Sequence, residues 1–302
     1  MWTESAGFGG AWIPEHHAAP DGYMPSPLVA LAAIAARTRT MRIGTGVALA
    51  PLYHPVRFAE DCAVLDTLSG GRLELALAIG YRRREAATFG VDFSKRGRIF
   101  DEFLDIVRRL WAGETVSHDS PFFRLDNATI APTPAAGKVP LWIGGFADKA
   151  LDRVVRHADG YFGTEEVAAS YIAKMAAAGR DPAEAKVGIP GLYVTVARDP
   201  EAALEELAPY YHYVNSVYAD WAREDNALGL DSAGTATLDL DQFKASGILQ
   251  IWTPEQAVAK FRAMRDRIPM DHYMMLMPPG LPPERATAYA QEFASGVLPA
   301  FA

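Results

Sequence analysis

Short apolar runs alternate with longer segments whose apolar residues recur every three or four positions, and this alternation continues along the whole chain. The run 73–79 is almost continuously apolar, as in parallel strands that are covered on both faces. Such alternation over 302 residues favours an α/β protein, either a (β/α)8 barrel or a doubly wound sheet. The pattern predicts seven strands, at residues 10–14, 41–49, 73–79, 140–143, 160–163, 186–197 and 272–277.

Helical patterns lie between and after these strands, and their ends carry the expected residues. Pro55 stands at a first helical position, Gly70-Gly71 follows the last turn of the same helix, and Thr253 precedes Pro254 as an N-cap. The predicted helices span residues 27–37, 55–68, 97–111, 148–157, 167–178, 201–211, 254–267 and 284–294.

The segment 214–247 breaks this rhythm. It is weakly periodic, carries scattered aromatics such as Tyr218 and Trp221, and contains a Gly/Ser/Thr-rich stretch at 229–237. A connection of this length in a compact barrel is usually a lid or a binding loop, and the alternative is a disordered surface insertion. We therefore expect one domain over residues 1–302, with 214–247 as a lid or insertion before the last strand.

Composition narrows the class of protein. Half of the residues are hydrophobic and the net charge is −8, which argues against a nucleic-acid or anionic-membrane surface. Cys62 is the only cysteine and lies in an apolar helical pattern, so we expect a core thiol in a protein of the reducing cytoplasm. No signal peptide is recognised at the start, and no uncharged apolar run approaches the ~20 residues that span a bilayer.

The strongest candidate for chemistry is Glu15-His16-His17, which follows the apolar run 11–14. The carboxyl ends of strands are where α/β folds place their sites, and histidine transfers protons near neutral pH. From the residues alone, a catalytic His16 and a His16 satisfied by Glu15 or by the backbone are equally supported, and His17 is expected to orient its neighbours or to pack. A metal site is a third reading, but the other histidines lack metal-ligand spacing, so none is expected.

An ordered series of short motifs resembles one family. The series contains Gly7-Phe8, Glu15-His16-His17 after Trp12-Ile13-Pro14, Ile43-Gly44-Thr45-Gly46-Val47, His54-Pro55-Val56-Arg57-Phe58-Ala59-Glu60, Leu65-Asp66, Leu68-Ser69-Gly70-Gly71-Arg72, Gly80-Tyr81, Phe89-Gly90, Leu110-Trp111, Pro140 to Gly145, Ala158-Asp159-Gly160 and Val297-Leu298-Pro299. The chain thus resembles the bacterial luciferase-like flavin monooxygenases over nearly its whole length. This resemblance implies a (β/α)8 TIM barrel, reduced flavin as cosubstrate and dioxygen chemistry.

The start of the chain departs from that family, whose members usually carry a strand and a helix ahead of the position of Gly7-Phe8. Here Glu4-Ser5-Ala6 matches the last turn of that helix. We therefore expect a barrel that lacks its first β/α unit and has seven strands. The alternatives are that the start is assigned too late, that the barrel is open on one side, or that another segment fills the gap.

The resemblance also implies roles for individual residues. His16, with Glu15, would act near the reactive edge of the flavin. Gly46-Val47 matches a non-proline cis peptide behind the flavin ring, although an ordinary trans glycine is what the sequence alone favours. The turn Gly144-Gly145-Phe146-Ala147 would bind the flavin phosphate through backbone N–H groups at a helix start, helped by Lys149, because the family often has serine where this chain has Ala147.

Two further groups are candidates. Tyr81 is expected beside the cofactor, and one of Arg82, Arg83 and Arg84 could contact phosphate, the alternative being a solvated charged loop. Tyr211 and Tyr213 are candidates for the substrate side, the alternative being an aromatic cluster at a helix end.

The resemblance, with these residues, indicates a monooxygenase that uses reduced FMN and dioxygen to oxygenate a small organic substrate. A separate flavin reductase is expected, because no G-x-G-x-x-G dinucleotide motif is evident. Hydride transfer with a 5-deazaflavin, coenzyme F-420, is one alternative, and a non-catalytic or degenerate flavin-binding protein is another. Family members are often dimers, so a homodimer is expected.

Overall fold

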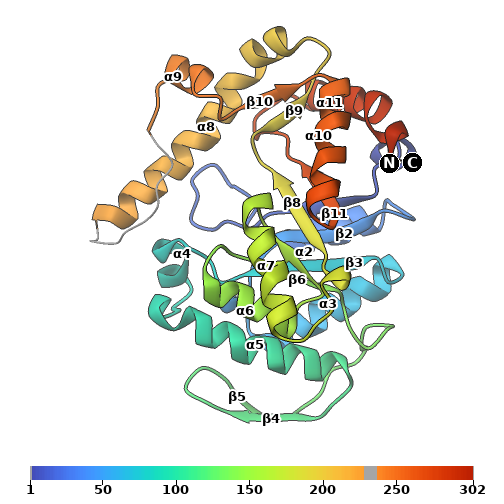
Figure 1. Ribbon diagram of the computed structural model, residues 1–302. Coiled ribbons are helices and arrows are strands. Elements are labelled where there is room, and N and C mark those ends of the chain that lie inside the picture. Colours follow the sequence, from blue (N-terminus) through green and yellow to red (C-terminus); the bar gives the residue numbers. More distant parts are fainter. Residues whose placement is uncertain (1, 228–236, 302) are drawn as a thin grey trace. The chain divides into compact units, whose positions relative to one another are not determined.

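The computed structural model describes residues 2–227 and 237–301 (Figure 1). The chain divides into two compact units. The first consists of Gly9–Gly188, and the second combines Trp2–Phe8 with Ile189–Ala302. Each unit is described by itself below.

The main sheet has seven strands in the order β1-β2-β3-β6-β7-β8-β11. The pairs from β1 through β8 for which a register is defined are all parallel, which is the arrangement that the apolar run 73–79 predicted. The seven predicted strands are therefore found. Their bounds are β1 (Gly10–Ile13), β2 (Arg42–Leu49), β3 (Leu73–Ala78), β6 (Leu141–Gly144), β7 (Gly160–Phe162), β8 (Val187–Gly191) and β11 (Met270–Met275).

The predicted strand 186–197 is wrong in one respect, because the structure divides it. β8 ends at Gly191, directly after Pro190, which has no N–H to donate, and a turn leads to β9 (Val194–Val196). β9 pairs in parallel with β10 (Gln250–Trp252) in a separate two-stranded sheet. An antiparallel hairpin, β4 (Val116–Asp119) with β5 (Arg124–Ala128), was not predicted, because these polar strands contain no apolar run.

The helices follow the predicted order. A Thr253 capping box opens one of them, and Gly70, in the left-handed conformation at φ 73°, ends another. Short unpredicted helices are α1 (Trp2–Ser5), α4 (Arg83–Thr88) and the 3₁₀ turns η1 (Ala50–Leu52), η2 (Phe93–Lys95), η3 (Pro182–Glu184) and η4 (Leu298–Ala300). The predicted helices are α2 (Pro27–Ala35), α3 (Pro55–Ser69), α5 (Arg96–Trp111), α6 (Asp148–His157), α7 (Glu165–Ala177), α8 (Pro200–Ala227), α10 (Pro254–Arg267) and α11 (Pro283–Gly296).

The structure corrects the expected loop at 214–247. Helix α8 continues to Ala227, and α9 (Leu240–Ala245) begins at an Asp239 capping box. Residues 214–227 are helical because Val214, Ala219, Trp221 and Ala222 recur at helical spacing and are buried, a stripe that scattered polar residues hid in the sequence. Most of the Gly/Ser/Thr-rich stretch lies outside the described residues.

Arginine and aromatic contacts fix the strand ends in the first unit. The Arg72 guanidinium donates to the carbonyl oxygens of Ala35, Thr38, Met41 and Ser69, so it ties the turn before β2 to the turn before β3. Behind the sheet, Phe58 of α3 packs against Phe103 of α5 with ring centroids 5.1 Å apart. Cys62 is buried in the same layer, as expected of a core thiol, and burial raises its pKa.

The second unit has its own apolar core. Phe261, Phe293 and Trp252 are buried there together, and Phe8 stacks on Phe293 at 5.8 Å, which explains why the first residues belong to this unit. Within the described part of the chain, no helix combines the length and the apolar character needed to cross a membrane.

Close packing within the sheet generates a prediction. A Cβ at Gly44 would meet the Glu74 carbonyl oxygen and the Trp12 ring, whereas a Cβ at Gly9 would meet nothing within 4 Å. We expect Gly44→Ala to lower the free energy of unfolding by ~1–3 kcal/mol through overpacking, and Gly9→Ala to leave it nearly unchanged. Urea unfolding followed by circular dichroism measures both. Equal midpoints for the two variants would show that Trp12 moves aside at no cost.

Candidate functional site

The candidate residues of the first unit gather at one edge of its sheet. Glu15, His16 and His17 follow β1, Gly46–Val47 lies near the end of β2, and Gly144 ends β6. Because the strands between them are parallel, these positions share the carboxyl-terminal edge. This is the edge at which barrels and doubly wound sheets hold ligands.

Glu15 connects the ends of β1 and β2. It is 2% exposed and accepts hydrogen bonds from the Leu49 backbone N–H at 2.6 Å, the Tyr53 hydroxyl at 2.5 Å and His17 Nε2 at 2.9 Å. Burial and the adjacent Glu15 raise the pKa of Tyr53 far above its usual value, so its hydroxyl remains a donor. Glu15 therefore orients His17 and closes the β1–β2 connection.

A second buried carboxylate, Glu85 of α4, was missed in the sequence. It is 2% exposed and accepts from His16 Nδ1 at 3.1 Å, the His17 backbone N–H at 3.0 Å and Arg82 Nη1 at 3.1 Å. Burial alone would raise the pKa of Glu85, but these hydrogen bonds and the Arg82 charge hold its pKa below the usual range. The only sequence signal for Glu85 is its spacing of three residues from Arg82 after β3.

His16 is 8% exposed and packs edge-on against Tyr23 at 4.9 Å and Tyr81 at 6.1 Å between ring centroids. Its ring is bound by Glu85, a partner that the sequence did not indicate. An ionised carboxylate only accepts, so the contact with Glu85 favours the tautomer of His16 that carries a proton on Nδ1. His17 has the opposite arrangement, with Nε2 directed to Glu15.

The peptide bond between Gly46 and Val47 is cis, as the family resemblance implied and against the trans alternative. The pairing of β2 with β3 shifts register between Gly46 and Ala48. A Cβ at Gly144 would lie 3.3 Å from Val47 Cγ1 and 3.3 Å from the Phe162 carbonyl oxygen. The Val47 side chain therefore reaches the end of β6, and a Cβ at Gly144 would fit there only if its neighbours shifted.

The turn after β6 leads directly into α6. Gly145 has φ 149°, and a Cβ there would lie 2.7 Å from Ala150 Cβ, so this position requires glycine. Ala147 is the N-cap of α6, and no side chain caps this helix start. Phe146 is 71% exposed beside it. No side chain at the N-cap therefore competes with a ligand for the first backbone N–H groups of α6.

The arginines after β3 separate into different roles. Arg82 is 3% exposed and donates to the His17 carbonyl oxygen at 2.8 Å, so it is not part of a solvated surface. It supports the histidine loop, which is the segment 14–26 between β1 and α2. Arg83 stacks over Phe93 at 4.3 Å, and Arg84 is exposed. Tyr81 is 45% exposed, and its ring lies beside that of His16.

The substrate candidates lie in the second unit and differ from each other. Tyr211 is 1% exposed, and its hydroxyl is 2.9 Å from Thr195 Oγ1 and donates to the Leu276 carbonyl oxygen at 2.7 Å. Burial raises its pKa to about 12. Tyr213 is 44% exposed. Tyr211 is thus a core residue in this unit, and of the two only Tyr213 offers its ring to solvent.

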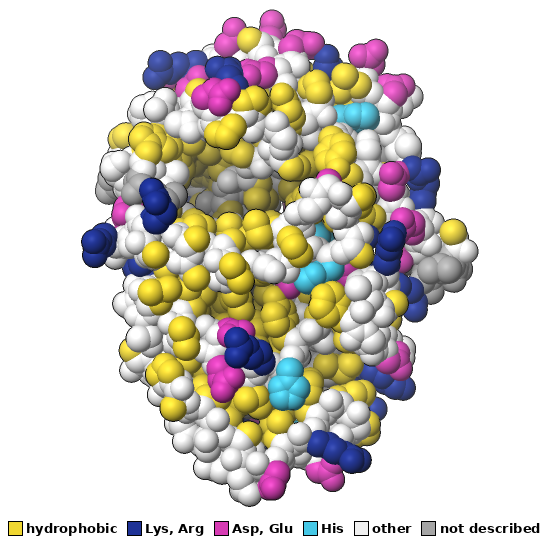
Figure 2. All heavy atoms as spheres, turned by 180° about the vertical axis from the view of Figure 1, so that it is seen from behind, with side chains coloured by type: hydrophobic (Ala, Val, Ile, Leu, Met, Phe, Trp, Pro, Cys, Tyr) yellow, Lys and Arg dark blue, Asp and Glu magenta, His cyan; other side chains and the backbone are white. Residues whose placement is uncertain are grey.

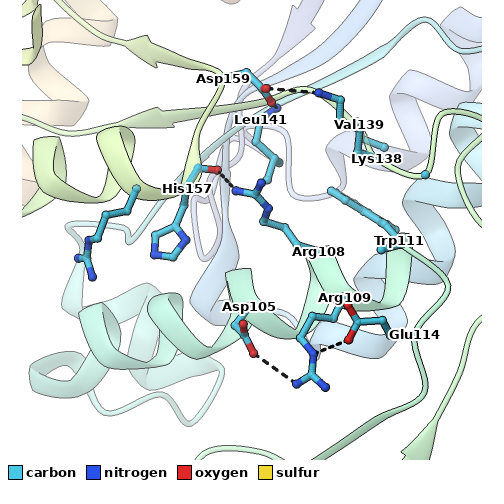
Figure 3. Close-up of a pocket in the computed structure, with 13 residues that line it drawn as sticks. Asp105, Arg108, Arg109, Trp111, Glu114, Lys138, Val139, Leu141, His157 and Asp159 are labelled. Atoms are coloured by element: carbon cyan, nitrogen blue, oxygen red, sulfur yellow. Dashed lines mark hydrogen bonds and ion pairs between the residues drawn. The ribbon is translucent and has the colours of Figure 1, made fainter. Parts of the chain in front are cut away.

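A cavity of about 490 Å³ lies at the opposite end of the sheet (Figure 3). Leu141, the first residue of β6, and Asp159, just before β7, line it with the ends of α5 and α6. Its charged groups are already engaged, as in Arg109 with Glu114 at 2.9 Å and Arg108 with the His157 carbonyl oxygen at 2.6 Å. Burial and the adjacent Arg156 and Arg108 lower the pKa of His157. This end of a barrel serves stability, so we do not assign the active site there.

The face shown in Figure 2 carries charged side chains of both signs. Figure 2 shows basic and acidic side chains interspersed with hydrophobic ones on the face it displays. Within the described ranges, no three His, Cys, Asp or Glu side chains are grouped so that they could hold a metal ion.

Comparisons with known proteins identify the family. The luciferase-like monooxygenase family matches residues 2–270. The oxygenase component of a flavin-dependent trigonelline monooxygenase from Acinetobacter baylyi is 31% identical over 144 residues, 47% of this chain and 40% of that protein. The chain spans less than half the length of the first curated relatives that it matches.

Solved structures share the fold at low identity. The oxygenating constituent of 3,6-diketocamphane monooxygenase from Pseudomonas putida, in complex with FMN, has a TM-score of 0.77 and 16% identity over 99% of this chain and 90% of that one. The coenzyme F-420-dependent tetrahydromethanopterin reductase of Methanopyrus kandleri has a TM-score of 0.72 and 17% identity over 99% and 93%.

The parallel sheet with helical connections and the site at its carboxyl edge define an α/β protein of the TIM-barrel type. The chain belongs to the luciferase-like monooxygenase family.

The Glu15 contacts generate a prediction. A glutamine at this position keeps one acceptor oxygen and turns its NH2 toward a buried donor. We expect Glu15→Gln to lower the free energy of unfolding by ~1–3 kcal/mol. Glu60→Gln is the control, because Glu60 is 43% exposed and lies 4.0 Å from Arg57, and its effect should stay within about 0.5 kcal/mol. Equal shifts in urea unfolding would mean that the Glu15 hydrogen bonds contribute no net stability.

Proposed function

We propose that this protein is a monooxygenase that uses reduced FMN and dioxygen to oxygenate a small organic substrate. The observation that carries the proposal is the placement of His16, Gly46–Val47 and the Gly144–Gly145 turn at the same edge of one parallel sheet. The relative from Acinetobacter baylyi is named as the oxygenase component of a flavin-dependent monooxygenase, which supports the same class of reaction.

The residues present fit a flavin mononucleotide. Gly144 and Gly145 keep the end of β6 free of Cβ atoms, and the start of α6 offers backbone N–H groups and the positive end of a helix dipole for a phosphate. Gly145, Phe146 and Ala147 would hold that phosphate. Gly46 and Val47 would support the ring system, and the exposed rings of Tyr81 and Phe146 add aromatic surface.

His16 is the proposed acid–base group, with Glu15 fixing its neighbour His17. Reduced FMN, when bound, supplies the two electrons with which dioxygen is activated. His16 Nε2 accepts or returns a proton, while its Nδ1–H remains hydrogen-bonded to Glu85. The low exposure of His16, Glu15 and Glu85 limits exchange of that proton with bulk water.

A separate flavin reductase would supply the reduced FMN, because the sequence carries no dinucleotide-binding motif and the flavin-dependent relative is named as an oxygenase component. A homodimer remains a prediction. Val29 on α2 and Val64 and Leu68 on α3 are each more than half exposed, and α2 packs against α3, so these helices offer an apolar surface for a second copy.

Binding and oxygen uptake test the function. Purified protein is mixed with FMN, with FMNH2 under anaerobic conditions, and with coenzyme F-420, and binding is followed by fluorescence before oxygen is admitted. We expect FMNH2 to bind more tightly than F-420, and bound FMNH2 to consume oxygen at a rate different from that of free FMNH2. Selective binding of F-420 would support hydride transfer instead, and binding of none of the three would indicate a degenerate protein.

Ala147 tests the phosphate position. An aspartate at this N-cap would place a carboxylate beside the phosphate, and at an effective dielectric constant of ~20 two unit charges ~5 Å apart cost about 3 kcal/mol, or roughly 100-fold in affinity. We expect Ala147→Asp to weaken FMN by about that factor and to affect riboflavin, which has no phosphate, much less. Ala147→Asn is the matched neutral control.

Dissociation constants from fluorescence titration decide this point. Equal losses for FMN and riboflavin in the Ala147→Asp protein would place the phosphate elsewhere, with Arg84 the next residue to replace.

A further inference from the structure

Glu85 holds two consecutive residues of the histidine loop through a single oxygen. Its Oε1 accepts from the His16 ring, from the His17 backbone N–H and from Arg82 Nη1, at 3.0–3.1 Å. Arg82 Nη1 also donates to the His17 carbonyl oxygen at 2.8 Å. Arg82 and Glu85 therefore fix both the N–H and the C=O of His17, as well as the ring of His16.

This contact joins segments that are far apart in the sequence. Glu85 lies on α4, and His16, which follows β1, is 69 residues away in the sequence. The loop is also fixed from the other side, because the His16 backbone N–H donates to the Met24 carbonyl oxygen at 3.2 Å and the His16 ring packs edge-on against Tyr23. The His16 ring thus has one orientation, set by Glu85 and Tyr23.

We propose that Glu85 is a positioning residue that keeps the His16 proton on Nδ1 and so presents Nε2 as the nitrogen for proton transfer. The proposal rests on the function proposed above, because it assigns Glu85 a part in the same reaction. When Nε2 accepts a proton, the Nδ1–H bond is kept, Glu85 remains ionised, and the imidazolium is stabilised by the adjacent carboxylate.

Charge and burial support this assignment. Burial opposes the ionised form of Glu85, but its hydrogen bonds and Arg82 hold its pKa below the usual range, so the carboxylate is an acceptor at neutral pH. Among the described residues Glu85 Oε2 accepts no hydrogen bond, although it is buried. The donors are concentrated on Oε1, the oxygen that faces the histidine loop. A carboxylate whose only role was to stabilise the fold would gain more by using both oxygens.

The fold provides a matched control in Glu102. This carboxylate also receives a histidine, since His118 Nε2 lies 3.0 Å from Glu102 Oε2, and the Ser120 hydroxyl donates to the same oxygen at 2.6 Å. Its pKa is likewise lowered, by the hydrogen bonds from Ser120 and His118 against a burial effect that raises it. The pair belongs to α5 and the β4–β5 hairpin, outside the candidate site.

The first test needs no substrate. Protein with 15N-labelled histidine is studied by long-range 1H–15N correlation NMR, and the His16 signals are assigned by their loss in His16→Ala. In the unsubstituted protein we expect the neutral form of His16 to carry its proton on Nδ1 and none on Nε2. A protonated Nε2 with an unprotonated Nδ1 would overturn the proposal, whatever the variants do.

The two Glu85 variants distinguish loss of the hydrogen-bond acceptor from loss of the negative charge. Glu85→Ala removes the acceptor, so we expect an Nε2–H population to appear at His16. Glu85→Gln keeps an acceptor oxygen and should retain the Nδ1–H form. Glu102→Ala should change the His118 signals and leave those of His16 as they were. An unchanged single Nδ1–H form in folded Glu85→Ala would contradict the proposal, and if that variant does not fold, a His16 signal in Glu85→Gln that has moved to Nε2–H would do so.

The kinetic readout is the reoxidation of bound FMNH2 by dioxygen, followed by absorbance in stopped flow. We expect Glu85→Ala to change this rate by roughly 10- to 100-fold, with little change in the dissociation constant of FMNH2. Effects of that size are found when the hydrogen-bond partner of a metal-ligating histidine is removed. Glu85→Gln should restore much of the rate. A loss confined to the dissociation constant would assign Glu85 to binding and reject the positioning role.

The two proposals fail separately. An Nδ1–H form of His16 that depends on Glu85, in a protein that binds neither FMN nor FMNH2, would retain the effect of Glu85 on the ring and reject the monooxygenase function. Reaction of bound FMNH2 with dioxygen, in a protein whose His16 carries its proton on Nε2, would retain the function and reject the role of Glu85.

Discussion

A carboxylate can be buried only where donors replace its lost water, and two such carboxylates organise the candidate site. Glu15 draws the backbone of β2, the Tyr53 hydroxyl and His17 toward the end of β1. Glu85 draws His16, His17 and Arg82 together from the side of α4. Each histidine ring therefore has its own acidic partner, and rotation of either ring would cost a buried carboxylate one of its donors.

Close packing places these groups. Glycines at Gly44 and Gly160 allow the rings of Trp12 and Trp142 to lie flat against neighbouring strands, and Arg72 ties the turns before β2 and β3. The strands cannot slide while these contacts hold, because a one-residue shift would turn every side chain to the other face. The carboxyl ends of the strands are thus held in register, which proton transfer over hydrogen-bond distances requires.

The fold alone does not choose the reaction. An FMN-bound monooxygenase component and a coenzyme F-420-dependent reductase match this chain with similar TM-scores, 0.77 and 0.72. A shared barrel shows only a shared fold. The reaction depends on the side chains of the site and on the cofactor that they bind. In the function proposed for this chain, the groups that would make this choice are His16 with its Glu85 partner and the Gly144 to Ala147 turn.

The order of the strands and helices, the seven strands, the core position of Cys62 and the place of Glu15, His16 and Gly144 at strand ends could all be predicted from the sequence. These follow from local periodicity and from glycine and proline positions, which act over a few residues. The helical conformation of residues 214–227, the burial of Tyr211 and the contact of Glu85 with His16 could not be predicted in this way. Those outcomes depend on which surfaces meet after folding, and a hydrogen bond between residues 69 apart leaves no periodic signal in the chain.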